Sequence, residues 1–142
     1  SDVITDGSKF LVRCVHPSDS FSTDDKNQAS LILEYKSDST SILFAGDADA
    51  EALEFMYENE LDIHNQDSNI RAYDVIKVPH HGSKYSFYSR LYEGAELAVI
   101  SCGYKNIYHH PHTEVLDGLS EAGVPVLRTD EMGAIVLRGK RN

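Results

Sequence analysis

The sequence predicts an α/β fold with a mixed sheet and flanking helices. Short apolar runs of strand length alternate along the chain with segments of helical pattern. Some runs follow one another directly, as antiparallel neighbours do, and others are separated by a helix, as parallel neighbours are. Apolar residues make up 41% and charged residues 25% of the 142 residues, which is ordinary globular composition. We therefore expect a single domain spanning 1–142, long enough to bury a core.

The first strand is expected over 10–15. His16-Pro17 closes it, because proline has no N–H to donate to a neighbouring strand. The segment 18–27 is rich in Ser, Thr and Asp and is predicted to be a loop. The runs 30–35 and 41–45 flank a short polar stretch, which predicts a hairpin.

A helix is expected to open at Asp47 and cover 47–56, because its acidic first turn suits the positive end of the helix dipole. A short helix is expected over 87–92. A longer one over 113–122 ends at Gly123, which is a typical C-terminal stop. The remaining strands are expected at 74–78, 97–101, 124–127 and 134–137.

The formal charge of −10 indicates which partners fit the chain. An acidic surface repels phosphate backbones, so no extended nucleic-acid surface is expected. A phosphate-containing substrate remains compatible, because divalent metal ions can reverse the local field. No apolar stretch approaches the roughly 18 residues of a membrane helix. The first residues lack signal-peptide features, so we expect a cytoplasmic protein or a domain of something larger.

The residues that carry chemistry follow two of the expected strands. His80-His81-Gly82-Ser83 comes after 74–78, and Asp47 comes after 41–45. Carboxylates and imidazoles at neighbouring strand ends are how α/β enzymes assemble hydrolytic metal sites. Asp47 could equally cap a helix, and Ser83 could bind an anionic substrate or cap the next helix.

His16 ends the first strand, and the same strand-end reasoning makes it a candidate metal ligand, although a single histidine there is usually structural. Asn27, at the end of the polar loop, could orient a substrate or terminate the loop.

A second cluster, His109-His110-Pro111-His112, follows the strand at 97–101. These histidines could supply a general acid or bind a phosphate group. The segment could also be a loop that caps a helix, or a site that stores zinc. Cys14 and Cys102 have no CxxC spacing and are predicted to be reduced and buried.

Taken together, these motifs resemble the metallo-β-lactamase fold superfamily, and within it the hydrolase domain of ComEC-type competence (DNA internalisation) proteins and their soluble relatives. The resemblance runs from about Phe10 to Leu137. It rests on an ordered set: Asn27-x-x-Ser30-Leu31, Gly46-Asp47, Lys77-Val78-Pro79-His80-His81-Gly82-Ser83, Tyr108-x-His110-Pro111-His112 and Arg128-Thr129-Asp130-x-x-Gly133-Ala134-Ile135.

The resemblance implies an αβ/βα sandwich with a dinuclear site, usually zinc, with manganese as an alternative. It implies that His16, Asp47 and His81 are metal ligands, although the choice between His80 and His81 is open. It further implies that His80, His110 and His112 lie on the substrate side or behind the ligands, which makes them the candidate catalytic groups. Asn27 and Ser83 remain the candidate substrate-binding residues from the reading of the residues themselves.

The chain departs from the family at one point. The leading motif HxHxDH, or its variant HxDxDH, supplies most of the ligands, and no histidine precedes His16. The chain therefore corresponds to the C-terminal, βα half of the sandwich, without the N-terminal half. We expect it to pair with that missing half or with a second copy, because a half-sandwich leaves apolar surface exposed.

Two functional hypotheses follow. In the first, the chain is the C-terminal part of a metal-dependent hydrolase acting on phosphodiester or related ester bonds, with competence-related DNA among the candidate substrates, and is inactive alone. In a competence-type parent protein it would be tethered to a membrane. In the second, it is a non-catalytic half-domain or assembly module. The retention of Asp47 with His-His-Gly-Ser favours the first.

Overall fold

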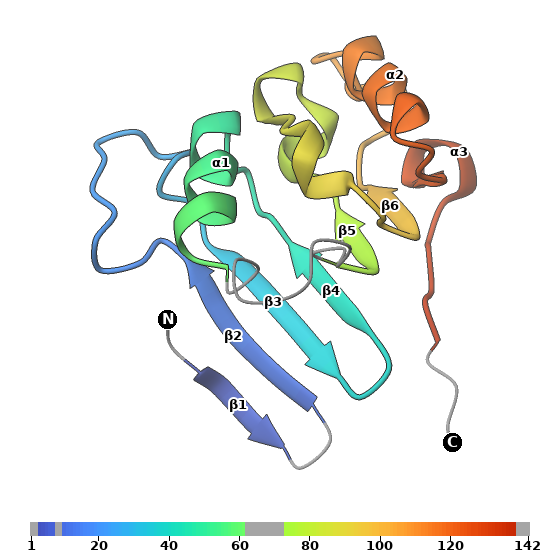
Figure 1. Cartoon of the computed structure of the whole chain (residues 1–142). Helices are drawn as coiled ribbons and strands as arrows, with labels where there is room; N and C mark the ends of the chain where they lie inside the picture. Colours follow the sequence, from blue (N-terminus) through green and yellow to red (C-terminus); the bar gives the residue numbers. More distant parts are fainter. Residues whose placement is uncertain (1–2, 8–9, 62–72, 139–142) are drawn as a thin grey trace.

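The computed structural model describes residues 3–7, 10–61 and 73–138, and these residues form a sheet with helices packed on it (Figure 1). The strands of the sheet are β1 (Val3–Gly7), β2 (Phe10–His16), β3 (Ile32–Ser37), β4 (Ser41–Phe44), β5 (Val75–Lys77), β6 (Leu97–Ile100) and β7 (Val126–Arg128). The α-helices are α1 (Ala50–Asn59), α2 (Thr113–Glu121) and the single turn α3 (Thr129–Met132). Three short 3₁₀ segments lie between β5 and β6: η2 (Pro79–Gly82), η3 (Lys84–Ser86) and η4 (Ser89–Tyr92).

The sheet is mixed, as the sequence predicts. The strands lie in chain order from β1 to β7, with antiparallel pairing from β1 to β4 and parallel pairing from β4 to β7. This arrangement brings the C-terminal ends of β2, β4, β5, β6 and β7 to the same edge of the sheet, which we call the site edge. Ligands of α/β proteins bind outside the carboxyl ends of their strands, so this edge is where a site is expected.

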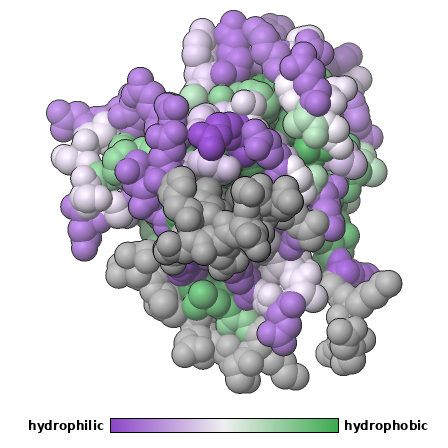
Figure 2. All heavy atoms as spheres, in the orientation of Figure 1, coloured by the Kyte–Doolittle hydropathy of each residue, from purple (hydrophilic) through white to green (hydrophobic). Residues whose placement is uncertain are grey.

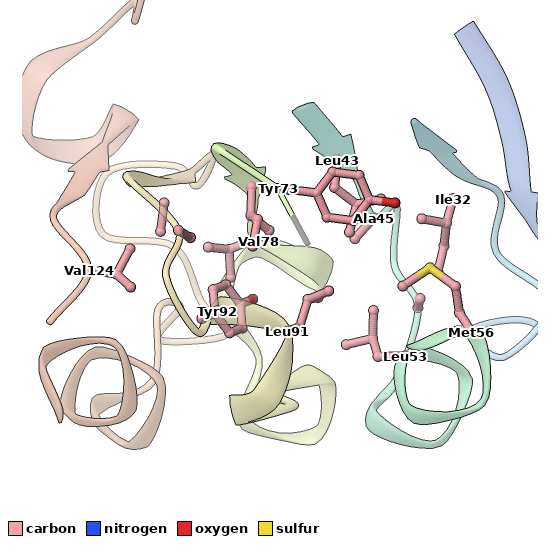
Figure 3. Packing of buried hydrophobic residues seen from close by; sticks show 14 of the residues in the cluster. Ile32, Leu43, Ala45, Leu53, Met56, Tyr73, Val78, Leu91, Tyr92 and Val124 are labelled. Atoms are coloured by element: carbon pink, nitrogen blue, oxygen red, sulfur yellow. The ribbon is translucent and has the colours of Figure 1, made fainter. Parts of the chain in front are cut away.

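The hydrophobic core lies between one face of the sheet and the helices (Figure 3). Successive strand residues point to opposite faces, and in β4, β5 and β6 the buried residues lie on the face that the helical layer covers. Leu43, Ile76 and Ala98 are fully buried, as are Leu53 of α1 and Leu91 of η4. On the opposite face the alternate positions remain partly or largely exposed, among them Ile42, Phe44, Val75 and Val99.

A buried carboxylate ties the antiparallel strands together. Glu34 of β3 is 1% exposed and accepts hydrogen bonds from Arg13 (2.6 Å) and from the hydroxyl of Tyr73 (2.9 Å), and it pairs with Lys36 (2.8 Å). Burial acts to raise the pKa of Glu34, but the hydrogen bonds from Lys36, Arg13 and Tyr73 and the charge of Lys36 outweigh it and lower the pKa. Glu34 is therefore held ionised inside the fold.

Among the expected elements, the helix at 47–56 and the strand at 134–137 differ in the structure, and one observed strand is not predicted. The helix predicted from Asp47 begins at Ala50 and is capped by Asp49, whose carboxylate accepts a 2.9 Å hydrogen bond from the backbone of Ala52. The strand predicted at 134–137 is wrong: Gly133, with φ of 73°, ends α3, and 134–138 runs on without strand pairing (Figure 1). A strand needs a neighbour for its N–H and C=O groups, and no described strand lies beyond β7. β1 is a further strand that the sequence pattern does not predict.

The described surface is mostly hydrophilic over α1 and α2 in the view of Figure 2, in keeping with the formal charge of −10. Both cysteines are free thiols of intermediate burial. Among the described residues, none of the helices combines the length and apolar character needed to cross a membrane.

Candidate functional site

The two adjacent histidines lie in a turn with unusual backbone geometry. His80, His81 and Gly82 follow β5 with φ values of 44°, 57° and 86°, so two non-glycine residues in succession adopt left-handed conformations. Such conformations cost of order 1–3 kcal/mol each and gather at functional sites. The turn is held by hydrogen bonds from the His80 amide to Gly46 O (3.0 Å) and from the Ser83 amide to His80 O (3.0 Å). Its effect is to bring the two imidazole centroids within 6.3 Å of each other, whereas an extended strand would point them to opposite faces.

His81 is oriented towards Asp47. Its Nδ1 lies 2.6 Å from the carbonyl oxygen of Ser101, which can only accept, so Nδ1 carries a proton and donates it. In the neutral ring Nε2 then has its lone pair free, and this atom lies 3.9 Å from Oδ1 of Asp47. Asp47 is about half exposed, and since Asp49 caps α1, the helix-cap alternative for Asp47 is wrong.

The second histidine cluster joins the first at the same edge. The ring of His110 lies 5.8 Å from that of His80 and 6.4 Å from that of His81, and His112 lies 4.8 Å from His110. The backbone amide of His112 donates to Gly82 O at 2.9 Å, which joins the two loops directly. Four imidazoles and one carboxylate therefore line one stretch of the site edge; they are Asp47, His80, His81, His110 and His112.

The protonation of this cluster follows from its contacts. The backbone N–H of Lys84 donates to Nδ1 of His112 at 3.1 Å, so the neutral His112 ring carries its proton on Nε2. Burial, together with the neighbouring rings of His112, His80 and His81, lowers the pKa of His110. The cluster thus combines a free lone pair on His81 with an N–H on His112.

His16 is at the site edge but faces away from these groups. It is fully buried, with Nδ1 3.1 Å from Glu60 and Nε2 2.8 Å from the backbone oxygen of Gln28. Both ring nitrogens are therefore used by protein groups. In addition, β3 separates β2 from β4, and two strand spacings amount to about 10 Å.

The two expected substrate-binding residues have other surroundings. Ser83 is 3% exposed, and its hydroxyl accepts from the backbone of Tyr85 (3.4 Å), which makes it the cap of η3. Asn27 is exposed in the loop after β2, where its backbone contacts Asp25 and Ser30. These hydrogen bonds give both residues structural roles within their own loops.

Lys77 lies at the same edge and is part of a sequence motif that assigns it no role. It is the last residue of β5, on the partly exposed face of the sheet between Phe44 and Val99, and its ammonium lies 3.5 Å from Gly46 O. Burial lowers the pKa of Lys77, while the charge of Asp47 acts in the opposite direction. In the sequence, the feature that could have drawn attention to Lys77 is a lysine at the end of an otherwise apolar strand.

The donors at this edge fit only part of a metal site. Zinc lies about 2 Å from its ligands, so one ion can be shared by atoms up to about 4 Å apart, which includes the pair His81 Nε2 and Asp47 Oδ1. Within the described ranges, however, no three His, Cys, Asp or Glu side chains are grouped to hold one ion. His81 and Asp47 therefore supply two metal ligands, and a complete zinc site needs at least three protein ligands.

No protein-family model matches the chain. The ComE operon protein 3 of Bacillus subtilis (strain 168) is 39% identical over 117 residues, which is 81% of this chain and 14% of that protein. The competence protein ComA of Neisseria gonorrhoeae is 32% identical over 124 residues, 85% of this chain and 17% of that protein. The chain thus spans less than a fifth of the length of either relative. These two similarities support a competence-related family for the chain.

Proposed function

We propose that the chain is the C-terminal part of a metal-dependent hydrolase domain that cleaves phosphodiester bonds during DNA uptake. The observation that carries the proposal is the convergence of Asp47, His80, His81, His110 and His112 at one edge of the sheet. The similarity to the ComE operon protein 3 and to the competence protein ComA supports a competence-related role, and DNA as the substrate is part of the proposal.

Asp47 and His81 would hold the metal ion. His81 is the better ligand of the two adjacent histidines, because its Nδ1–H is fixed by a backbone carbonyl and its Nε2 faces a carboxylate. Metal-binding histidines usually donate their second nitrogen in this way. His80 has only a 3.5 Å contact between Nδ1 and Ser86 Oγ. Zinc or manganese, when bound, would supply an activated water and neutralise phosphate charge.

The remaining donors would come from outside this set. His16 would have to leave both Glu60 and Gln28 to bind metal, so the fit favours ligands from an N-terminal half of a metallo-β-lactamase-type sandwich, or from a second copy. The partly exposed apolar positions of the sheet, among them Ile42 and Phe44, offer a face on which such a partner could pack.

The other histidines would act on the substrate. His112, with its proton on Nε2, can donate to a phosphate oxygen or to the leaving group. His110, whose pKa is lowered by burial and neighbouring rings, stays largely neutral near pH 7 and can accept a proton. The rings of His80, His81 and His110 lie 5.8 to 6.4 Å from one another, so His80 can contact the same anion.

The second candidate function, a non-catalytic assembly module, is favoured by the absence of a third donor in the part of the chain that the structure describes. The two candidates differ in what happens when the rest of the protein is present. A hydrolase gains metal and activity, whereas an assembly module gains neither.

The test is metal binding with matched variants. Zinc and manganese titrations of the 142-residue chain should show weak binding that Asp47→Asn and His81→Gln abolish. His109→Asn is the control, because His109 is exposed and its φ of 56° suits asparagine. The full-length gene product should hold about two equivalents and cleave a fluorescent oligodeoxynucleotide, and Asp47→Asn should stop cleavage. Metal-free, inactive full-length protein would instead support the assembly module.

A further inference from the structure

We propose that Tyr108 stacks a base of single-stranded nucleic acid beside the histidine cluster, with Tyr104 and Tyr85 as further exposed rings on the two loops that carry the histidines. We call these three residues the aromatic rim. The inference rests on the proposed function and names the form of nucleic acid that the site would take. Tyr108, Tyr104 and Tyr85 are 68%, 74% and 73% exposed, so they present apolar surface that a stacked base could cover.

Tyr108 is connected to the site by ring stacking. Its ring is 5.8 Å from that of His110 at an interplanar angle of 24°, and His110 lies 6.4 Å from His81 at 20°. The three near-parallel rings lead from the exposed loop to the atom that faces Asp47. His110 covers one face of Tyr108, so a base would stack on the opposite face and extend this row of rings, with the adjoining sugar–phosphate running back towards the histidine cluster.

The loop that carries Tyr104 and Tyr108 is held in place by one side chain. The amide of Asn106 donates to Gly103 O (3.0 Å) and His110 O (2.6 Å), and its oxygen accepts from the His110 amide (2.9 Å). The exposed rings are thus presented by a loop that is already ordered, which reduces the entropy lost on binding.

Positive charge accompanies the rings. The ammonium of Lys105 lies 5.2 Å from the ring of Tyr104, and that of Lys84 lies 5.5 Å from the ring of Tyr85. The backbone N–H of Lys84 donates to His112, and its ammonium also pairs with Glu114 at 3.3 Å, so part of its charge is already compensated within the chain. Aromatic rings interleaved with a few cations are typical of surfaces that bind single strands.

The same features argue against duplex DNA at this rim. Bases inside a duplex are already stacked and cannot lie on a protein ring, whereas every unpaired base has a free face. A duplex also needs a broad basic surface, and the chain carries a formal charge of −10. Local lysines beside exposed rings therefore fit a short stretch of single strand.

The experiment is fluorescence anisotropy with the 142-residue chain in zinc-free buffer. The probes are a labelled twelve-nucleotide oligothymidylate, an abasic strand of equal length and a duplex. Tyr108→Leu should weaken oligothymidylate binding by about 5- to 100-fold, and Tyr108→Phe should keep it. The abasic strand should bind weakly to wild type and Tyr108→Leu alike. Phe10→Leu is the control, because Phe10 is an exposed ring at the far end of β2.

Equal binding of oligothymidylate by wild type and Tyr108→Leu would overturn the proposal, as would equal binding of the abasic strand and oligothymidylate. The outcome is separate from that of the proposed function, because Tyr108→Leu should leave zinc binding intact. Loss of metal binding in Asp47→Asn tests the hydrolase, and loss of stacking in Tyr108→Leu tests the rim.

Discussion

Gly82 and Pro111 pack so closely that a Cβ on Gly82 would lie 2.6 Å from the Cβ of Pro111. This contact joins the two histidine loops, and Gly82 also has a φ of 86°. Gly82→Ala should therefore destabilise the chain by about 2–4 kcal/mol, from backbone strain together with overpacking. Urea unfolding of the 142-residue chain measures this change.

Gly123→Ala is the matched control for Gly82→Ala. Gly123 has a φ of 69°, but a Cβ added to it would have no heavy atom within 4 Å beyond its immediate chain neighbours, so only the strain remains. It should cost about 1 kcal/mol. Equal losses for the two variants would mean that the packing of Gly82 on Pro111 does not matter to stability.

Asp47 and Asp49 are two residues apart but have different roles: Asp49 caps α1, and Asp47 faces His81 as a proposed metal ligand. Asp49→Ala removes the cap of α1 and should cost about 1 kcal/mol of stability while zinc binding is unchanged. Asp47→Ala should leave stability within about 0.5 kcal/mol, because Asp47 is half exposed, and should abolish zinc binding. Thermal unfolding and zinc titration of both variants check this. A loss of zinc binding in Asp49→Ala alone would contradict the assignment.

Much of the fold could be predicted from the sequence because local patterns dominate it. The hairpin of β3 and β4, the parallel strands and α2 follow from apolar periodicity and turn residues. The strand predicted at 134–137 failed because an apolar run cannot show whether a neighbouring strand exists to pair with it. The helix boundary failed because Asp47 and Asp49 are equally good caps in sequence, and only the three-dimensional path of the chain separates them.

The candidate site, like the fold, could be predicted from the sequence only in part. Strand-end reasoning predicted a site edge, and Asp47, His80, His81, His110 and His112 do meet there. It could not predict that His16 turns inward, because the partner that holds it, Glu60, lies 44 residues away. The rings of the aromatic rim also carry no sequence signal, since exposed and buried tyrosines look alike.

Lys77→Met should leave the stability of the chain unchanged or raise it by up to about 1 kcal/mol, because it removes a half-buried charge from between Phe44 and Val99. Because the charge of Lys77 also acts on Asp47, the variant should bind inorganic phosphate more weakly in the presence of zinc. Lys77→Arg keeps the charge and is the control. Clear destabilisation by Lys77→Met, with unchanged phosphate binding, would assign Lys77 a purely structural role.

Glu34 should make stability depend on pH in the acid range. Its pKa in the folded chain is lowered from the ordinary value of 4.5, so the unfolded chain takes up a proton first as the pH falls. The stabilisation is therefore complete above about pH 4.5 and is lost as the pH falls through the folded-state pKa. Glu34→Gln should cost about 2 kcal/mol at pH 7, because Arg13 and Lys36 lose their partner. Below the folded-state pKa of Glu34 the two proteins should converge, since both then carry a neutral group at this position. Urea unfolding at a series of pH values measures the difference, and a gap that stays constant down to pH values where Glu34 is protonated would show that its charge does not stabilise the sheet.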